Sequence, residues 1–408
     1  MLQSFVNSIV FVPPRDPNSL QRVQLLQHQR YMRFTHKKSG ERVAYYHFAS
    51  NGDLVTDSTL QRVVRSSMVG LYHHGNAEDL GGAFGYAKSM ASAFNISVVA
   101  FDYCGYGLSG AQGVTRPAEV TEKSVYSDAD HMYTHLLSLG YPAHRIVLIG
   151  RSVGGGPACY LAEKHHKEVA GLVLISTFTS CLRVVSTCWL PYLCCCVDLF
   201  PNYRRVQRIG ECPVLLMHGT DDDVVPCHCS CELLADIEAQ RTDALHQLLK
   251  RRSRARARRA SSSGAARTNS TALTSTANTS TAQAPPKELL AAAHHPPLEG
   301  EAVSVYDLYR RAYDNLPEAV RQAGERRLAV AADDICIGAF HKWFAGCGHN
   351  DIEVHEGQAF SEMFVWFLRF TAAFSREREA VLLSTESRTH AAQGAADPDT
   401  PVDGVRRE

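Results

Sequence analysis

One short segment constrains this chain more than any other. Residues Val147–Gly155 read Val-Leu-Ile-Gly-Arg-Ser-Val-Gly-Gly, which predicts an apolar strand running straight into Gly-x-Ser-x-Gly and then a helix. This context is that of a nucleophile elbow, in which the serine sits on a sharp strand-to-helix turn. Gly150 and Gly154 give that turn room, because a Cβ at either position would meet the neighbouring strand or helix. Ser152 is therefore a candidate nucleophile, and a purely structural glycine-rich turn is the alternative.

A serine hydroxyl becomes a useful nucleophile only when a base takes its proton, and the base in turn needs an acid. In folds with this elbow the acid precedes the histidine along the chain. Residues Pro213–Pro226 form an apolar strand that ends in His-Gly-x-x-Asp-x-x-Val-Pro. Spacing favours Asp222 as the acid. Asp221 and Asp223 are more typical of solvated or turn-forming neighbours, but a shift by one position stays open.

The candidate base is His349. The chain has nineteen histidines, but this one follows an apolar strand and stands after Gly346-Cys-Gly. Glycines ahead of it would let a loop carry the imidazole over the elbow. Asp222 would then fix its tautomer and stabilise the imidazolium.

A fourth element is typical of an oxyanion hole. Residues Ser67–Leu80 read as a strand that ends in His-Gly-Asn before a helix. The backbone N–H of Asn76 is expected to pair with that of Val153 and to hold the negative charge of a tetrahedral intermediate. A simple strand-end turn is the alternative, and the other three elements favour the functional interpretation.

The chain as a whole limits its class. Its 408 residues suffice for one large α/β domain with insertions, and its net charge of zero gives no electrostatic drive toward nucleic acid. The first residues lack the basic start and cleavage site of a secretory signal, and no uninterrupted apolar run reaches about 18 residues. The thirteen cysteines are then expected to be reduced thiols in a cytosolic setting.

Strand and helix patterns alternate along the chain. An opening hairpin over residues 31–48 is followed by strands and helices in turn, and the alternation predicts a mostly parallel, doubly wound α/β sheet with the site at the carboxyl ends of its strands. Expected strands cover residues 67–73, 96–101, 147–150, 171–176 and 213–218, and expected helices cover residues 78–94, 119–139 and 357–374.

Two polar stretches divide this pattern. The core is expected over residues 1–241 and 299–374, separated by a disordered insertion at 242–298 and followed by a frayed polar tail at 375–408. The insertion begins with the arginine-rich run Lys250–Arg259. Three interpretations of that run are open: a solvated spacer, a nuclear-import-like patch, or a contact for anionic lipid headgroups.

A cysteine-rich apolar segment is the other unusual feature. Residues 177–205 fall where a lid over the site is expected, and an apolar lid suits an acyl-chain substrate. Cys194, Cys195 and Cys196 are candidates for reversible palmitoylation, with small hydrophobic core residues as the equal alternative. The Cys227–Cys231 cluster lacks a second ligand pair at zinc-site spacing, so no metal and no cofactor is expected.

Five motifs together carry a family resemblance: His74–Gly81, Asp102–Gly107, Gly150–Gly154, His218–Asp222 and Gly348–Glu353. They resemble the α/β-hydrolase-domain-containing protein 17 family of membrane-attached protein depalmitoylases. The resemblance covers nearly all of the expected folded part and implies an α/β-hydrolase fold. It gives Ser152, Asp222 and His349 the roles of nucleophile, acid and base.

This sequence departs from that family at two places. Members carry an acylated, cysteine-rich N-terminus, whereas the first cysteine here is Cys104. Arg151 stands where the family usually has glutamine, and it either alters substrate preference or points at solvent. Acylation of N-terminal cysteines is therefore not expected to attach this chain to a membrane. Cys194, Cys195 and Cys196 are the candidates that could take over that role.

The expected function is a serine hydrolase that cleaves acyl thioesters or esters, with S-acylated proteins as the leading substrates and lipid esters next. A lipase, esterase or serine peptidase with the same triad is the alternative, and a non-catalytic scaffold a further one. The expected location is the cytoplasm, peripheral on the cytosolic face of membranes.

Overall fold

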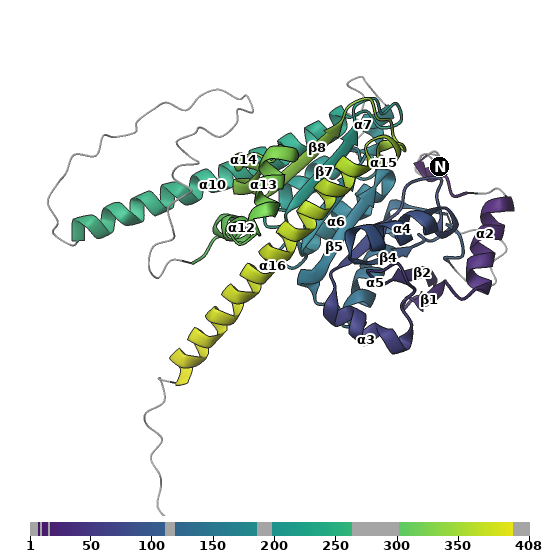
Figure 1. Ribbon diagram of the computed structural model, residues 1–408, viewed down its shortest axis with the longest axis horizontal. Coiled ribbons are helices and arrows are strands. Elements are labelled where there is room, and N and C mark those ends of the chain that lie inside the picture. The colour runs from purple at the N-terminus through teal and green to yellow at the C-terminus, as the bar shows by residue number, and fades with distance from the viewer. Residues whose placement is uncertain are drawn as a thin grey trace, which may run out of the picture.

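The computed structural model describes residues 7–8, 10–14, 17–110, 119–185, 198–262 and 302–394. Within them lies an eight-stranded sheet in the order β1-β2-β4-β3-β5-β6-β7-β8 (Figure 1). β1 and β2 form the antiparallel hairpin, and β3 to β8 are parallel to one another. The mostly parallel, doubly wound sheet predicted from the sequence is confirmed.

The strands lie close to their predicted bounds. They are β1 (Arg33–His36), β2 (Arg42–Phe48), β3 (Val69–His73), β4 (Ser97–Phe101), β5 (Ile146–Arg151), β6 (Gly171–Ile175), β7 (Val214–Gly219) and β8 (Ala339–Phe344). Because β3 pairs with both β4 and β5, the order of winding reverses there. Such a switch point is where parallel sheets place their ligand sites, at the carboxyl ends of the strands.

The helices connect these strands across both faces of the sheet. They are α2 (Pro17–His28), α3 (Asp57–Ser66), α4 (Leu80–Phe94), α5 (Glu122–Ser138), α6 (Gly155–His165), α7 (Cys181–Val185), α9 (Asn202–Arg205), α10 (His228–Ser262), α12 (Val305–Asp314), α13 (Glu318–Arg327), α14 (Ala332–Ile337), α15 (Ile352–His355) and α16 (Gly357–Gly394), with short 3-10 turns η1 (Ala143–Arg145), η2 (Ser152–Gly154) and η3 (Val206–Arg208). Helices α12 to α14 were not anticipated.

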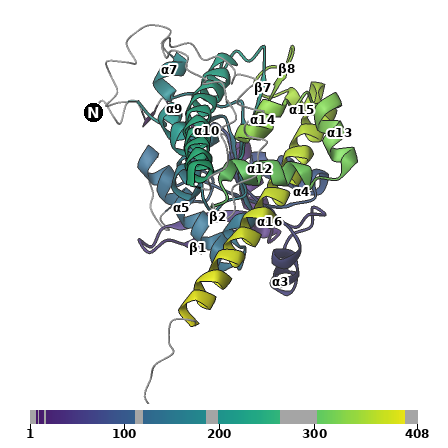
Figure 2. The same ribbon diagram turned by 90° about the vertical axis from the view of Figure 1, so that its left-hand side faces the viewer.

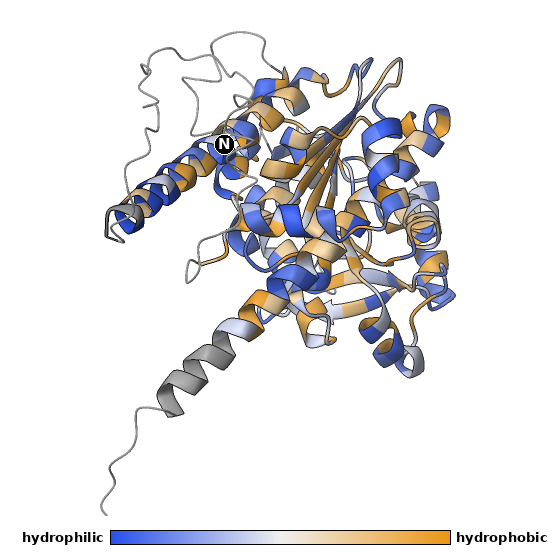
Figure 3. Ribbon diagram, turned by 60° about the vertical axis from the view of Figure 1, so that its left-hand side comes forward, coloured by the Kyte–Doolittle hydropathy of each residue, from blue (hydrophilic) through white to orange (hydrophobic). Residues whose placement is uncertain are grey.

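Alternation along the strands creates two cores. In β5, Val147 and Ile149 belong to the core beneath α4, α12 and α16, whereas Leu148 belongs to the core beneath α5 and α6. Successive strand side chains point to opposite faces, so a strand buried on both faces is apolar throughout. The central strands are accordingly hydrophobic along their length (Figure 3).

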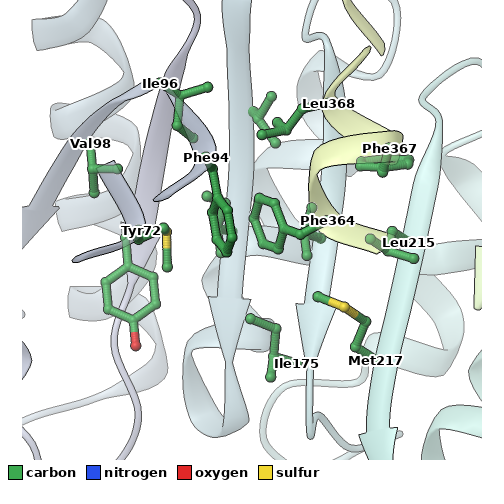
Figure 4. Close-up of a cluster of buried hydrophobic side chains, with 14 of the residues drawn as sticks. Tyr72, Phe94, Ile96, Val98, Ile175, Leu215, Met217, Phe364, Phe367 and Leu368 are labelled. Carbon is green, nitrogen blue, oxygen red and sulfur yellow. The ribbon is translucent and has the colours of Figure 1, made fainter. Parts of the chain in front are cut away.

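The closing helix α16 packs its aromatic residues onto the first of these cores. Phe364 stacks on Phe94 at 4.2 Å between ring centroids, and Phe367 and Leu368 lie beside them over the strands (Figure 4). This packing joins α4, from the first half of the chain, to the last helix. The core-packing role predicted for residues 357–374 is confirmed.

The predicted disorder is wrong for residues 242–262, which continue α10 without a break. The polar composition favours a solvated chain, but Arg, Ala, Leu and Lys are strong helix formers and this stretch has no Gly or Pro. Tertiary contacts also hold α10 where this stretch begins. Arg241, directly before it, is buried and donates to the carbonyl oxygens of Ile209, Ile337 and Gly338. The insertion's remaining residues, 263–298, lie outside the described residues.

A buried ion pair explains why part of the arginine-rich run is ordered. The Arg252 guanidinium donates to both carboxylate oxygens of Asp307 on α12, at 3.0 and 2.6 Å. Burial alone would raise the pKa of Asp307, but Arg252 and Ser304 donate to the carboxylate and the net shift is downward. The pair fastens α10 to α12, and the solvated-spacer interpretation fails at this residue.

The frayed tail predicted from residue 375 is also wrong at its start, because α16 runs on to Gly394 and leaves the body of the molecule (Figures 1 and 2). Arg378 is buried and donates to the carbonyl oxygen of Val169 at 3.0 Å, just before β6. The Arg378 guanidinium thus anchors the start of this polar segment to the body of the molecule. Residues 395–408 lie outside the described residues.

The predicted lid, residues 177–205, is described only at its two ends, which include α7 and α9. Cys194, Cys195 and Cys196 lie outside the described residues, so their palmitoylation stays a prediction. Among the helices that are described, none combines the length and hydrophobicity needed to cross a bilayer.

We expect Arg252→Met to lower the free energy of unfolding by about 3 kcal/mol, because it leaves the Asp307 carboxylate buried without its cation. Urea unfolding monitored by circular dichroism measures this. Arg254→Met, at an exposed position of the same helix, should stay within about 0.5 kcal/mol of the parent. Equal effects of the two substitutions would show that the ion pair does not anchor α10.

Candidate active site

The elbow forms as the sequence predicts. β5 ends at Arg151, and Ser152 begins η2, which leads directly into α6. Ser152 has φ of +51°, in the left-handed region that a residue with a side chain rarely adopts. Such strain persists only where the surrounding structure enforces it, and it is common at functional sites.

Close backbone contacts enforce this turn. A Cβ on Gly154 would lie 2.1 Å from the carbonyl oxygen of His73 on β3, and one on Gly150 would lie 2.6 Å from the carbonyl oxygen of Gly154. The Thr177 hydroxyl donates to the carbonyl oxygen of Ser152 at 2.9 Å and fixes the elbow from the β6 side. Three strand ends therefore converge on the serine.

The structure brings Ser152, His349 and Asp222 into one hydrogen-bonded chain. His349 Nε2 lies 3.0 Å from Ser152 Oγ, and His349 Nδ1 lies 2.7 Å from Asp222 Oδ2. A carboxylate only accepts hydrogen bonds, so Nδ1 carries the proton, and the neutral ring accepts the serine O–H at Nε2. This arrangement can draw a proton from the hydroxyl.

Asp222 is held on both of its oxygens. Oδ1 accepts the backbone N–H groups of Val224 and Val225 at 3.0 and 2.8 Å. Burial favours the neutral acid, but hydrogen bonds from His218, His349 and Val225 overcome it and hold the pKa of Asp222 well below its usual range. The carboxylate is therefore charged at neutral pH.

The alternatives by one position do not reach this chain. Asp221 and Asp223 are exposed, and Asp221 accepts a hydrogen bond from the neighbouring Thr220 hydroxyl. The His-Gly-x-x-Asp spacing therefore led to the aspartate that contacts His349. Sequence reasoning missed a second histidine, His218, which also contacts Asp222. Its place in the His-Gly-x-x-Asp motif was the available signal.

The expected oxyanion donors flank the serine. Asn76 lines the same cavity as Ser152 and His349, and Val153 follows Ser152 at the start of the helical turn. The Asn76 side chain fixes its own loop, since Oδ1 accepts from the Val12 N–H at 2.9 Å and from Tyr106 at 2.8 Å. That anchoring role was not anticipated from the sequence.

The cavity beside Ser152 is lined by charged side chains and has an apolar rim of exposed valines. Its volume is about 840 Å³. Charged side chains line it, namely Arg22, Glu78, Asp79, Arg151 and Glu353. At its edge lie Val12, Val224 and Val354, which come from separate segments and are 48%, 57% and 78% exposed.

Arg151 does not point at solvent, so the second of the two alternatives given for the departure from glutamine is wrong. Its guanidinium donates to Glu353 at 2.8 Å and lies 5.2 Å from the centre of the Tyr86 ring, with 11% of the side chain exposed. Tyr86 donates to the same Glu353 oxygen at 2.9 Å. Arg151 therefore ties the elbow to α15, the helix that follows His349.

Glu78 is a cavity residue that the sequence analysis did not single out. It accepts the Gly75 N–H at 3.2 Å, next to the expected oxyanion donor Asn76. Burial raises the pKa of the Glu78 carboxyl, and the Gly75 N–H and Arg151 oppose that shift. The cavity lining thus carries opposite charges close together, those of Glu78 and Arg151.

Sequence comparison is consistent with this geometry. Residues 67–197 match the family model described as "Serine aminopeptidase, S33". The chain is 36% identical over 160 residues to the α/β-hydrolase domain-containing protein aho-3 of Caenorhabditis elegans, covering 38% of this chain and 43% of that protein. It is 33% identical over 156 residues to human α/β-hydrolase domain-containing protein 17B, covering 38% and 50%. The chain spans about half the length of the curated relatives it matches.

Solved hydrolases align over most of the chain. A predicted CIB-like hydrolase from Thermoplasma acidophilum covers 83% of this chain and 99% of its own at 16% identity and a TM-score of 0.39. A monoacylglycerol lipase from Paleococcus ferrophilus covers 81% and 99% at 14% identity and a TM-score of 0.41.

We expect Gly154→Ala to destabilise the protein by about 3 kcal/mol or more, because the added methyl group would overlap the His73 carbonyl oxygen and a backbone has little freedom to move. Thermal and urea unfolding measure the change. Gly85→Ala is the matched control: this helical glycine is exposed and has no atom within 4 Å of an added Cβ, so alanine should stabilise by up to about 1 kcal/mol. A Gly154 variant as stable as the parent would contradict the close approach at the elbow.

Proposed function

We propose that this chain, an α/β-hydrolase, cleaves acyl thioesters and esters with Ser152 as nucleophile, His349 as general base and Asp222 as the orienting acid. The single observation that carries the proposal is the hydrogen-bonded chain from Ser152 Oγ through His349 to Asp222, of which Ser152 and His349 line the cavity. A scaffold protein has no need of a strained serine in contact with an oriented imidazole.

The reaction follows from this geometry. Ser152 Oγ attacks the acyl carbonyl carbon while its proton passes to His349 Nε2, and the carbonyl oxygen becomes an oxyanion. Collapse of the intermediate breaks the bond to the thiolate or alkoxide, which takes the proton from His349. Water, deprotonated by His349 in the same way, then adds to the acyl-serine carbonyl. Collapse of this second intermediate releases the carboxylic acid, and Ser152 Oγ takes the proton back from His349. The Asp222 carboxylate stabilises the imidazolium in both steps.

The oxyanion is assigned to the N–H groups of Asn76 and Val153. Val153 lies at the N-terminus of a helix, where N–H groups lack intrahelical acceptors and the helix dipole favours negative charge. The hydrogen bonds of the Asn76 side chain hold its loop before substrate arrives. Donors fixed in this way need no reorganisation as the negative charge develops.

S-acylated protein is the substrate class we favour, because of the resemblance to the protein 17 family and because of the apolar rim. Three exposed valines at the mouth of a polar cavity suit a substrate whose acyl chain is apolar and whose thioester is polar. A serine peptidase is the second candidate, since the matching family model carries that description. Both reactions pass through the same acyl-serine.

The same rim supports peripheral contact with a membrane. Val12, Val224 and Val354 are exposed around the opening, and inserting them among acyl chains would remove apolar surface from water. A lipid-anchored acyl group would then reach Ser152 without crossing much water.

We expect Ser152→Ala to abolish labelling by a fluorophosphonate probe and to lower turnover of a palmitoyl-thioester by about 10⁶-fold, since the nucleophile is lost. Asp222→Asn should lower kcat by about 10⁴-fold, because the imidazole loses its oriented tautomer. In-gel fluorescence and a free-thiol assay on the purified proteins measure these two quantities.

Asp221→Asn is the matched control and should leave both readouts near the parent values. Labelling without thioester turnover would keep the nucleophile and redirect the assignment to esters or peptides. No labelling of folded parent protein would exclude a serine hydrolase.

We expect Val354→Asp, at the most exposed valine of the rim, to reduce turnover of a palmitoylated peptide in lipid vesicles by about tenfold, because a charge would then meet the bilayer where an apolar side chain did. Turnover of a short-chain, water-soluble ester should change less than twofold. Leu137→Asp, at an exposed apolar position of α5 that does not line the cavity, is the control. Equal loss on both substrates would contradict an interfacial role for the rim.

A further inference from the structure

We infer that His218 is a positioning residue for this site, holding Asp222 through the same carboxylate oxygen that His349 contacts; the inference rests on the proposed catalytic function. His218 is the next-to-last residue of β7 and is fully buried. It contacts neither the cavity nor Ser152, so any effect on the reaction passes through Asp222.

The two ring nitrogens of His218 have fixed surroundings. Nε2 lies 3.0 Å from Asp222 Oδ2 and 2.7 Å from the carbonyl oxygen of Val225. Both neighbours only accept hydrogen bonds, so Nε2 carries a hydrogen and donates. Asp222 Oδ2 thereby receives one N–H from His218 and another from His349.

The other side of His218 leads back to the elbow. Nδ1 lies 2.6 Å from the hydroxyl of Ser230 at the start of α10, and that hydroxyl lies 3.3 Å from the carbonyl oxygen of Thr177. The Thr177 hydroxyl donates to the carbonyl oxygen of Ser152. A continuous path of contacts therefore leaves Ser152 and returns to it. Its members, in order, are His349, Asp222, His218, Ser230 and Thr177.

Removing His218 takes one hydrogen-bond donor away from the Asp222 carboxylate. His218 and His349 supply the side-chain donors on the carboxylate, while Asp221 and Asp223 are exposed. The thiols of Cys227 and Cys229 on the facing segment stay neutral, because burial raises the pKa of both, that of Cys227 to about 12. Nothing else near the carboxylate in the described residues replaces the lost N–H.

An Asp222 oxygen with one donor fewer is a stronger acceptor for the remaining donor, His349. It holds the imidazolium proton more tightly, so the pH at which His349 becomes a free base rises. The acid limb of kcat/KM, which reports that deprotonation in the free enzyme, should then move to higher pH. The carboxylate also gains rotational freedom, which lowers kcat through poorer alignment.

The test compares three variants of the full chain, with the palmitoyl-thioester as substrate. His218→Leu removes the donor and should lower kcat by roughly 30-fold, less than the loss for the triad acid itself, with KM nearly unchanged and the acid limb displaced upward. His218→Gln keeps an N–H near the position of Nε2 and should restore most of kcat and the parent pH profile. His47→Leu replaces another buried histidine, on β2 and bonded to Tyr141, and should lower stability without moving the acid limb.

A folded His218→Leu protein with the parent kcat and pH profile overturns the inference, as does a loss that His47→Leu reproduces at equal stability. If His218→Leu does not fold, Ser230→Ala carries the test: it releases Nδ1 and should displace the acid limb in the same direction, and an unchanged profile overturns the inference. Failure of the proposed function is distinguishable, because the parent protein itself would then show neither labelling nor turnover.

Discussion

Everything at this site depends on the close approach of three backbone segments around Ser152. The ends of β3 and β5 and the start of α6 are so near that Gly154 has space only for a hydrogen beside the His73 carbonyl. That crowding forces Ser152 into a positive φ and exposes its hydroxyl at the switch point of the sheet. The apolar strands buried on both faces supply the packing free energy that makes such strain tolerable.

A second dependence is electrostatic. Asp222 is a buried carboxylate, and burial of a charge is costly unless donors surround it. Here β7 supplies His218, the following turn supplies two backbone N–H groups, and the loop after β8 supplies His349. The acid is therefore placed by three neighbouring elements, and the loop that carries His349 is oriented by a charge that the rest of the fold keeps in place.

The sequence was informative where local pattern decides structure. The strands, the elbow and the convergence of Ser152, Asp222 and His349 could be predicted, because strand periodicity, glycine sterics and chain order are local properties. It failed where a distant partner decides: Arg252 and Arg378 look solvated until Asp307 and the Val169 carbonyl are known. His218 was missed for the same reason, since its contact with Ser230 depends on how α10 packs.

The arginine beside Ser152 shows how a charged side chain can be accommodated at such a site. Arg151 spans from the elbow to Glu353 on α15, and Tyr86 donates to the same carboxylate. The cation therefore braces the segment that begins at His349 and adds no net charge to the cavity, because Glu353 compensates it. The cavity lining thus combines the ion pair of Arg151 and Glu353 with exposed valines. Under the proposed function, the reacting carbonyl would meet the fixed N–H donors and the acyl chain would meet the exposed valines at the opening.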